Sequence, residues 1–435
     1  MERDIIVKLN EWRNKTDRKP LILKGVRQCG KTFILKEFAN RYYSDTAYFN
    51  FEENPALKKV FEQDNDVKRI IFELELAFGK RIKEDDALII FDEIQECPKA
   101  LTSLKYFCEN AGGYHIACAG SLLGISINQN ASFPVGKVDF LTLYPMSFFE
   151  FVKALKGDFL SDHLRSAHEN GVPEVICGTL ETLLRQYYIV GGMPEAVEKW
   201  RTTEDIQAVE DIQQQILTSY QLDFAKHAPI NEFPKLSAIW RSIPEQLAKP
   251  NSKFIFSHVK KGWRSKDLED ALEWLIGAGL VYKVRKIEKP FMPLSAYSDE
   301  TSFKLYLSDV GLLRKMAGLP ASLVTEAADT VYKEFKGAMT ENYVLNELVK
   351  SVSENLFYWT SGNSAEVDFV LQCGSGIVPV EVKSEKNTKA KSLSEYRKKY
   401  SPEYSVITSM KERMSGHEVL NIPLYLICLI EKICG

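Results

Sequence analysis

The sequence has almost no net charge and no long apolar run, and each absence excludes a class of partner. Its 435 residues carry 56 Lys and Arg against 59 Asp and Glu, a formal net charge of −3. Whole-chain electrostatics therefore gives no reason to expect a nucleic-acid partner, which must be argued from local patches. No run approaches the roughly 18 apolar residues that span a membrane, so we expect no membrane partner.

Paired cysteines are also missing. The eight cysteines are scattered and include no C-x-x-C pair. This spacing predicts reduced, buried thiols rather than a zinc site or a disulfide framework. The first 14 residues are charged and lack the apolar core of a signal peptide, so we expect a cytoplasmic protein. With 45% hydrophobic and 26% charged residues, the composition is globular, and the length predicts roughly two to four domains.

A glycine-rich phosphate-binding motif lies near the N-terminus. Segment 19–24 is apolar, segment 25–32 reads G-x-x-x-x-G-K-[ST] in full, and 33–43 has the pattern of an amphipathic helix. Strand, glycine loop and helix form the context that this motif requires. The loop N–H groups are expected to wrap a β-phosphate at the helix N-terminus. The predicted phosphate-binding residues are Gly25, Val26, Arg27, Gln28, Cys29, Gly30, Lys31 and Thr32.

A second motif supports the first. Segment 87–93 is a continuous apolar run that ends in Asp92 and Glu93, as expected for a strand buried on both faces of a parallel sheet. Ligands of such sheets bind at the carboxyl ends of the strands. Lys31 would reach the β- and γ-phosphates, Thr32 and Asp92 would hold Mg²⁺, and Glu93 would polarise the attacking water. The two motifs predict a nucleoside-triphosphate site with hydrolytic activity.

Two further residues are candidates at this site. Segment 115–121 resembles a third buried strand and ends in Ser121, which would contact the γ-phosphate or the attacking water, or simply end the strand in a turn. Lys137 precedes the strand expected over 138–143. It would reach a phosphate in its own or a neighbouring subunit of an oligomer, or remain a solvated loop lysine.

Residues 1 to about 200 resemble the AAA-type P-loop ATPases that carry a C-terminal region called DUF4143. The resemblance rests on segments 25–32, 89–93, 119–121, 144–148 and 191–195. It implies ATP and Mg²⁺ as cofactors, Asp92 and Glu93 as the acidic pair, and Ser121 as a sensor-like catalytic residue beside Lys31 and Glu93. Relatives commonly have Arg where this chain has Lys137, and Lys lacks the planar fork of Arg.

The middle of the chain has two predicted parts. Segment 148–226 is helical and resembles the lid of this family, with Arg185 as a phosphate sensor or as a surface arginine. Segment 228–325 resembles a winged helix, with a helix at 268–275 and a hairpin formed by 280–287 and 303–307. The cations that would contact DNA phosphates are Lys253, Lys260, Lys261, Arg264 and Lys266. Three acids at 269, 270 and 273 would repel DNA, so packing or protein docking is an equal alternative.

The C-terminal region holds a second constellation. Asp368 lies on one predicted strand, and Glu381 and Lys383 on the next, after the turn at 374–376. With Glu341 on a predicted helix, this order resembles the PD-(D/E)xK nuclease signature. Strand alternation puts Glu381 and Lys383 on one face. Glu341, Asp368 and Glu381 would bind a second Mg²⁺ or Mn²⁺, and Lys383 would position a hydroxide. A lysine-rich run at 383–399 would follow a phosphate backbone or be a solvated face.

The expected fold class is α/β: a P-loop parallel sheet, a helical lid, a winged-helix-like segment and a restriction-endonuclease-like domain. The predicted boundaries are 1–150, 151–227, 228–325 and 326–435. The leading hypothesis is an ATPase coupled to a C-terminal module that binds nucleic acid or protein. A metal-dependent DNA nuclease regulated by the ATPase and a nucleotide-dependent scaffold that cleaves nothing are the alternatives.

Overall fold

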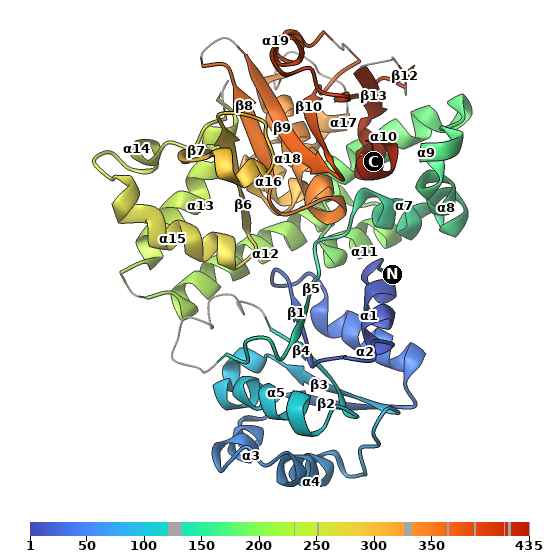
Figure 1. The fold of residues 1–435 in the computed structure, drawn as a ribbon, viewed down its shortest axis with the longest axis vertical. Helices are drawn as coiled ribbons and strands as arrows, with labels where there is room; N and C mark the ends of the chain where they lie inside the picture. Colours follow the sequence, from blue (N-terminus) through green and yellow to red (C-terminus); the bar gives the residue numbers. More distant parts are fainter. Residues whose placement is uncertain are drawn as a thin grey trace. The chain divides into compact units, whose positions relative to one another are not determined.

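The computed structural model describes residues 1–120, 133–229, 231–249, 252–325, 333–362, 365–386, 389–412, 414–415 and 419–434. The chain divides into two compact units (Figure 1). Unit 1 comprises Met1–Tyr144 with Gly277–Gly279, and unit 2 comprises Pro145–Ile276 with Leu280–Gly435. The predicted α/β fold class is confirmed: unit 1 contains a parallel sheet and unit 2 a separate mixed sheet.

Unit 1 is built on a five-stranded parallel sheet of order β2-β3-β4-β1-β5. Its strands in this order are Asp45–Asn50, Ala87–Asp92, His115–Ala119, Leu21–Lys24 and Asp139–Thr142. Strands β3 and β4 are buried along their whole length because their residues are apolar toward both faces. In a parallel sheet all carboxyl ends lie at one edge, and that edge receives the glycine loop after β1 and Asp92 at the end of β3.

Helices cover both faces of this sheet. They are α1 (Ile5–Arg13), α2 (Lys31–Tyr42), α3 (Lys58–Glu62), α4 (Val67–Phe78) and α5 (Pro98–Asn110). One core cluster packs α3, α4 and α5 against the strands, with Phe61, Ile70 and Leu104 meeting Phe49 and Phe91. Helices α1 and α2 lie side by side away from that cluster (Figure 1). Helix α2 begins at Lys31, so its N-terminus faces the glycine loop.

Unit 2 begins with a helical region. Its helices are α7 (Phe148–Lys156), α8 (Asp158–Arg165), α9 (Ala167–Asn170), α10 (Glu174–Val190), α11 (Pro194–Thr203), α12 (Ile206–His227), α13 (Phe233–Leu247), α14 (Phe256–Val259) and α15 (Ser265–Gly277). Further along the chain follow α16 (Val310–Met316), α17 (Ala321–Thr325), α18 (Lys333–Ser351), α19 (Lys391–Tyr400) and α20 (Ile430–Cys434). Helix α7 begins at a capping box in which Ser147 and Glu150 satisfy each other's backbone N–H.

An eight-stranded mixed sheet runs through unit 2 in the order β12-β13-β11-β10-β9-β8-β6-β7. The strands in chain order are β6 (Val281–Ile287), β7 (Ser298–Leu307), β8 (Phe357–Thr360), β9 (Glu366–Cys373), β10 (Gly376–Val382), β11 (Ser405–Ser409), β12 (Met414–Ser415) and β13 (Val419–Pro423). Helix α19 covers one face through Leu393 and Tyr396, which pack against Trp359 and Val367. Helix α18 contacts β7 and β10.

The structure groups the chain differently from the four predicted segments. The antiparallel hairpin of β6 and β7 forms as predicted, but it is not a separate wing. Strand β6 pairs in parallel with β8, with Arg285 opposite Phe357, and this pairing makes the hairpin the end of the C-terminal sheet. The lid-like helices belong to the same compact unit, and unit 1 ends at Tyr144 rather than at residue 150.

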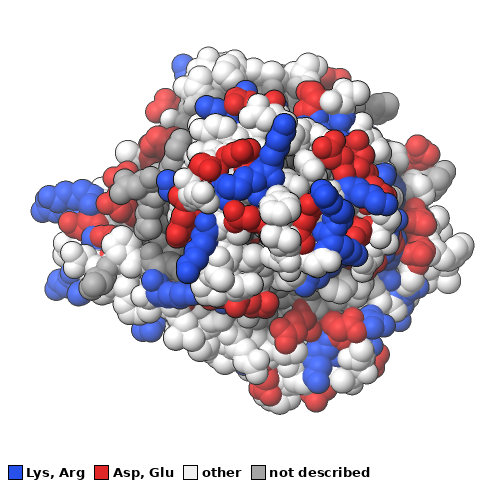
Figure 2. Space-filling view, turned by 90° about the horizontal axis from the view of Figure 1, so that it is seen from below, with Lys and Arg blue, Asp and Glu red and all other residues white. Residues whose placement is uncertain are grey.

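Surface and cysteine chemistry agree with the composition. All eight cysteines are free thiols, and five of them are buried. On the face drawn in Figure 2, basic and acidic side chains are interspersed. No helix in the described part of the chain is long and apolar enough to cross a membrane.

Candidate nucleotide site and a second acidic cluster

The glycine loop after β1 has backbone angles that suit a phosphate-binding turn. Gly30 adopts φ 93° immediately before α2, and Gln28 is left-handed at φ 64°. Alternating right- and left-handed backbone makes successive N–H groups point to one concave side, where they bind anions. The N-terminus of α2 adds its partial positive charge at the same place.

Lys31 is the first residue of α2 and is only 8% exposed. Its ammonium donates to the carbonyl oxygens of Gly25 and Val26, at 2.9 Å each. Both bonds hold the charge inside the curve of the loop rather than out in solvent. The ammonium thus lies beside the backbone of the glycine loop, as predicted for the lysine of this motif.

Thr32 and Asp92 meet at the carboxyl edge of the sheet. The Thr32 hydroxyl donates to the Asp92 carboxylate, with Oγ1 3.1 Å from Oδ1 and 2.9 Å from Oδ2. The Tyr48 hydroxyl on the neighbouring strand β2 donates to Asp92 Oδ2 at 2.7 Å, and Asn50 donates to Tyr48 at 3.3 Å. Burial, and then the bond to Asp92, raise the pKa of Tyr48. Asp92 is therefore held by neutral hydroxyl groups, and no ammonium is among these partners.

Glu93 follows Asp92 in a left-handed conformation, with φ 49°. This turn ends β3 and directs Glu93 away from the strand. The Gln95 side-chain amide, in the short helix Ile94–Glu96, donates to the Glu93 carboxylate. The carboxylate is half-buried and oriented by this amide. Such an arrangement suits a group that orients a water molecule.

The oxygen atoms at this edge fit a magnesium ion. Mg²⁺ prefers hard oxygen ligands and binds through one or two of them together with phosphate and water. The Thr32 hydroxyl and the Asp92 carboxylate already lie within hydrogen-bond distance of each other beside the loop. The two predicted ligands are thus brought together, from separate segments of the chain.

The other predicted residues of this site have different outcomes. Ser121 lies outside the described residues. Lys137 forms a 2.9 Å ion pair with Glu109, which raises the pKa of Lys137. Arg185 is on α10 in unit 2, beside Leu184, Lys336 and Met410 of that unit. Neither cation contacts the loop through any bond that the structure describes.

A second cluster of charges lies in unit 2 around Lys304 of β7. Lys304 is 1% exposed and forms ion pairs with Glu366 at 2.6 Å and with Glu341 at 3.6 Å. The Tyr306 hydroxyl donates to Glu341 at 3.0 Å. Burial alone would lower the pKa of Lys304, but Tyr306, Glu341 and Glu366 outweigh it, so this pKa lies well above its usual range.

The predicted nuclease residues border this cluster. Lys383 donates to Glu381 at 2.7 Å, so the two side chains share a face as strand alternation predicts. Asp368 is half-buried and accepts a 2.7 Å bond from the Val382 N–H. Burial, and then the charges of Glu341 and Glu381, raise the pKa of Asp368 well above its usual range. Burial also raises the pKa of Glu381.

Two lysines, Lys304 and Lys383, are paired with three of the carboxylates in and beside this cluster. Within the described ranges, no three His, Cys, Asp or Glu side chains are grouped closely enough to hold a metal ion. The predicted metal set of Glu341, Asp368 and Glu381 is therefore not assembled as such, and the Lys304 ammonium is bound to Glu341 instead. In contrast to the paired carboxylate oxygens of this cluster, Glu381 Oε2 is buried without a hydrogen-bond partner.

Two lysines of the basic segment before α15 contact other side chains of the protein. Lys253 donates to Ser302 at 3.1 Å, and Lys260 lies over the Trp263 ring at 4.7 Å. Lys261, Arg264 and Lys266 are exposed. The acids of α15 at positions 269, 270 and 273 are exposed as well, so the cations do not form a field of one sign.

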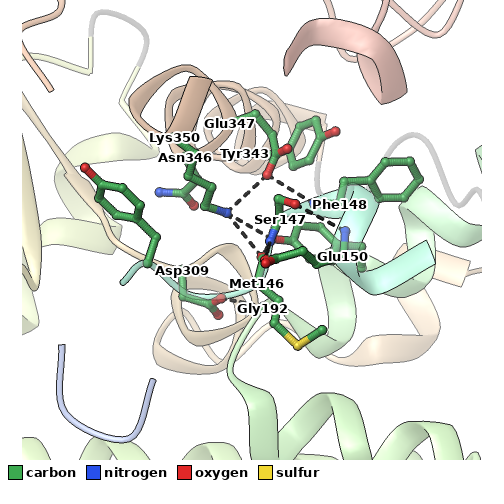
Figure 3. Close-up of polar contacts among 12 residues, drawn as sticks. Met146, Ser147, Phe148, Glu150, Gly192, Asp309, Tyr343, Asn346, Glu347 and Lys350 are labelled. Atoms are coloured by element: carbon green, nitrogen blue, oxygen red, sulfur yellow. Dashed lines mark hydrogen bonds and ion pairs between the residues drawn. The ribbon is translucent and has the colours of Figure 1, made fainter. Parts of the chain in front are cut away.

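Two motifs that carried the family resemblance meet in unit 2. The Met146 N–H donates to the Gly192 carbonyl at 2.6 Å, and the Gly192 N–H donates to Asp309 at 2.6 Å (Figure 3). Tyr187 and Lys350 both donate to the Met146 carbonyl, the latter at 3.2 Å. We call this group, completed by Glu347, the polar node. A Cβ on Gly192 would overlap the Met146 carbonyl, which explains the glycine.

Several functional candidates were not expected from the sequence. Tyr48 and Gln95 orient the two acids of the nucleotide site, and Lys304, Tyr306 and Glu366 complete the second cluster. A lysine within the otherwise apolar segment 303–307 is a signal for Lys304, because a strand buried on both faces rarely contains an unpaired charge. Tyr48 has no comparable local signal.

Three family models match the chain. Residues 17–152 match an AAA domain, and residues 336–425 match the domain of unknown function DUF4143. Residues 181–323 match a further domain of unknown function, DUF8612. The resemblance drawn from the motifs is thereby confirmed for the AAA and DUF4143 regions.

Individual relatives are distant. The uncharacterised protein MJ1544 of Methanocaldococcus jannaschii is 23% identical over 384 residues, which cover 85% of this chain and 75% of the relative. The Walker-type ATPase Paby2304 of Pyrococcus abyssi aligns with a TM-score of 0.46 and 16% identity, over 72% of this chain and 95% of its own. Cdc6p of Pyrobaculum aerophilum aligns with a TM-score of 0.25 and 13% identity, over 74% and 92%.

Proposed function

Because the chain combines an AAA domain with a C-terminal DUF4143 domain, we propose that it binds and hydrolyses ATP with Mg²⁺ and that this activity controls the C-terminal module. The observation that carries the proposal is the meeting of Thr32 with Asp92 beside a loop whose Lys31 is directed inward. These are the groups that phosphoryl transfer requires: a cation for the phosphates, oxygen ligands for the metal and an acid for water.

Each residue has a defined part in this proposal. The loop N–H groups and Lys31 bind the phosphates, and Thr32 and Asp92 hold the metal, which neutralises phosphate charge when it is bound. Tyr48 keeps the Asp92 carboxylate oriented toward Thr32. Glu93, oriented by Gln95, accepts a hydrogen bond from the attacking water.

Two substitutions test the assignment. Lys31→Ala should reduce nucleotide affinity by about 10-fold or more and ATP turnover by about 100-fold. Glu93→Gln should bind nucleotide with wild-type affinity and lose turnover to a similar extent, since it removes only the carboxylate that accepts from water. Fluorescent nucleotide titration and a phosphate-release assay give the two quantities.

Lys59→Ala is the matched control, because Lys59 is an exposed lysine of the same unit. It should behave as the unmutated protein in both assays. Turnover by Lys31→Ala at the unmutated rate would exclude this site as the ATPase centre.

A metal-dependent nuclease is the second candidate for the C-terminal module. It is favoured by Glu381 Oε2, a buried acceptor without a partner near the half-buried Asp368. Four carboxylates, at 341, 366, 368 and 381, surround two ammonium groups, which would leave the fully ionised cluster with a net negative charge. A divalent cation would compensate that charge, and so would protons retained by the acids with raised pKa.

Plasmid cleavage separates these alternatives. A nuclease should cut supercoiled plasmid with Mn²⁺, and Lys383→Ala should reduce the rate by about 100-fold, since it removes the charged donor next to Glu381. Lys398→Ala, an exposed lysine on α19, is the control. Absence of cutting, or cutting that is equal in Lys383→Ala and the parent, leaves the module as a binding element for nucleic acid or protein.

A further inference from the structure

The segment Leu143–Met146, here called the connector, leads from the nucleotide-binding sheet into unit 2. Strands β1 and β5 run in parallel, with Lys24 opposite Thr142. After the same register position, β1 continues into the glycine loop and β5 continues into the connector. The phosphate loop and the connector are therefore neighbouring exits from one edge of the sheet.

The backbones of the loop and the connector are in direct contact. The Leu143 N–H donates to the Lys24 carbonyl at 2.7 Å. A Cβ added to Gly25 would overlap the carbonyl oxygen of Leu143, so the first glycine of the loop is required by the connector's approach. A displacement of the loop at Gly25 would change this packing.

Arg3 bridges the same two segments by its side chain. One guanidinium nitrogen donates to the Cys29 carbonyl at 3.2 Å, and the other donates to the Tyr144 carbonyl at 2.6 Å. Arg3 is 6% exposed. Bonds from a charged donor in a buried place are strong, and the planar fork fixes the distance between its two acceptors. Cys29 lies two residues before Lys31, so this acceptor belongs to the phosphate-binding turn.

Beyond Tyr144, the chain reaches the polar node within two residues. Met146 is bonded at both its N–H and its carbonyl group, to Gly192 and to Tyr187 with Lys350 (Figure 3). The Lys350 ammonium also pairs with the buried Glu347 at 3.1 Å, and Glu347 accepts from the Phe148 N–H at 3.3 Å. A shift of the connector would therefore disturb several buried polar bonds at once, each of which costs free energy when it is left unmade.

We propose that Arg3 couples the phosphate loop to the connector. Nucleotide binding would then change how often the hydrogen bonds of the polar node in unit 2 break and re-form. The coupling rests on the proposed function, because it needs a nucleotide at the loop. Arg3 is a positioning residue in this scheme: it acts through the carbonyl groups of Cys29 and Tyr144. The path from Arg3 to Met146 is a continuous stretch of chain held by bonds at each end.

Hydrogen exchange of the full-length protein tests the coupling. Each protein is compared with and without Mg²⁺ and a slowly hydrolysed ATP analogue, at about ten times its own measured Kd, so that differences in affinity do not matter. In the unmutated protein the analogue should slow exchange in the loop peptide 25–32 and change it by about threefold in peptides covering 145–150 and 189–195.

Arg3→Lys keeps the positive charge and removes the planar guanidinium group that donates to both Cys29 and Tyr144. In this variant the loop peptide should stay protected by the analogue, while the change in peptides 145–150 and 189–195 disappears. Arg81→Lys is the matched control, because Arg81 is an 84% exposed arginine of the same unit, and it should behave as the unmutated protein. Arg3→Gln serves as a second variant should Arg3→Lys fold poorly.

The outcomes are distinguishable. If the analogue protects the loop of the unmutated protein but leaves peptides 145–150 and 189–195 unchanged, the coupling is refuted while the nucleotide site stands. The same holds if both Arg3 variants retain the full change in these peptides. If no nucleotide protects the loop of the unmutated protein, the proposed function fails, and the coupling fails with it.

Discussion

The nucleotide site of unit 1 and the acidic cluster of unit 2 hold their carboxylates in opposite ways. Asp92 accepts hydrogen bonds from the neutral hydroxyl groups of Thr32 and Tyr48. Glu341 and Glu366 are instead paired with the Lys304 ammonium. Neutral donors orient a carboxylate without cancelling its charge, whereas a buried ammonium cancels the charge that a metal would require. The partners of the acids, and not the number of acids, thus set the capacity of each site for a cation.

The lysines of the two sites also differ in the charge of their partners. Lys31 is bonded to carbonyl oxygens of its own loop, which a phosphate can replace as partner. Lys304 is bonded to carboxylates and is fully buried. In the proposed function the first lysine receives a phosphate, whereas the second is already paired with carboxylates. This contrast is why we assign the chemistry to unit 1.

The largest effect is expected from breaking the cluster of unit 2. Lys304→Met removes a buried ammonium and leaves the partly exposed Glu341 and Glu366 without their shared counter-charge. We expect unit 2 to lose about 3–5 kcal/mol of unfolding free energy, as measured by urea denaturation. Lys283→Met on the adjacent strand β6 is the control. Its ion pairs are 3.7 Å long and reach exposed acids, so it should cost about 1 kcal/mol or less.

Equal stability of Lys304→Met and the parent would show that the carboxylates do not need this counter-charge. Addition of Glu366→Gln to Lys304→Met should recover part of the loss, because it removes one of the two acids. The double variant therefore measures the pairing rather than the loss of packing alone.

A matched pair of aspartate substitutions sharpens the comparison. Asp92→Asn keeps the shape of the side chain and removes the charge at the metal position, so ATP turnover should fall about 100-fold, or about 2.7 kcal/mol. Asp368→Asn makes the same change in unit 2 and should alter turnover by about twofold at most. Phosphate release at saturating ATP measures both. Similar losses in the two variants would argue against the assignment of the chemistry to unit 1.

The smallest effect concerns pH. Burial raises the pKa of Asp368 above its value in the unfolded chain. The folded state therefore binds the proton more tightly, and the stability that this contributes is present at low pH and is lost as pH rises through the folded-state pKa. Asp368→Asn should remove this loss, so it should be more stable than the parent by about 1–2 kcal/mol at pH 8 and closer to it at pH 5.

Urea denaturation at pH 5, 6, 7 and 8 gives the two profiles. Asp270→Asn, an exposed position on α15, should follow the parent at every pH. A parent that gains stability from pH 5 to pH 8 relative to Asp368→Asn would contradict the raised pKa.

Local patterns predicted much of unit 1. The loop motif, the strand before it and the helix after it are contiguous, and the structure places them at β1 and α2 as expected. The meeting of Thr32 with Asp92 was also predictable, because parallel strands present their carboxyl ends at one edge. Tyr48 was not, since its contact with Asp92 depends on β2 being the neighbour of β3, and strand order leaves no local trace.

Long-range pairing explains what the sequence did not reveal in unit 2. The hairpin of β6 and β7 was expected, but its parallel pairing with β8 joins segments far apart in the chain. This pairing brings Lys304 into the acidic cluster and unites the predicted winged-helix and nuclease-like segments. The carboxylates could be predicted from the sequence, whereas the pairing of Lys304 with two of them could not, because it depends on which strands are neighbours.

The continuity of the eight-stranded sheet bears on where this region of the chain can be divided. The family models divide it: one ends at residue 323 and the next begins at residue 336, although β6 and β8 are bonded neighbours. A fragment that starts at residue 336 would lack β6, β7 and Lys304, expose the edge of β8 and leave its acids without their counter-charge. The two family matches therefore fall on one continuous sheet in this chain, and a boundary drawn between them would cut through that sheet.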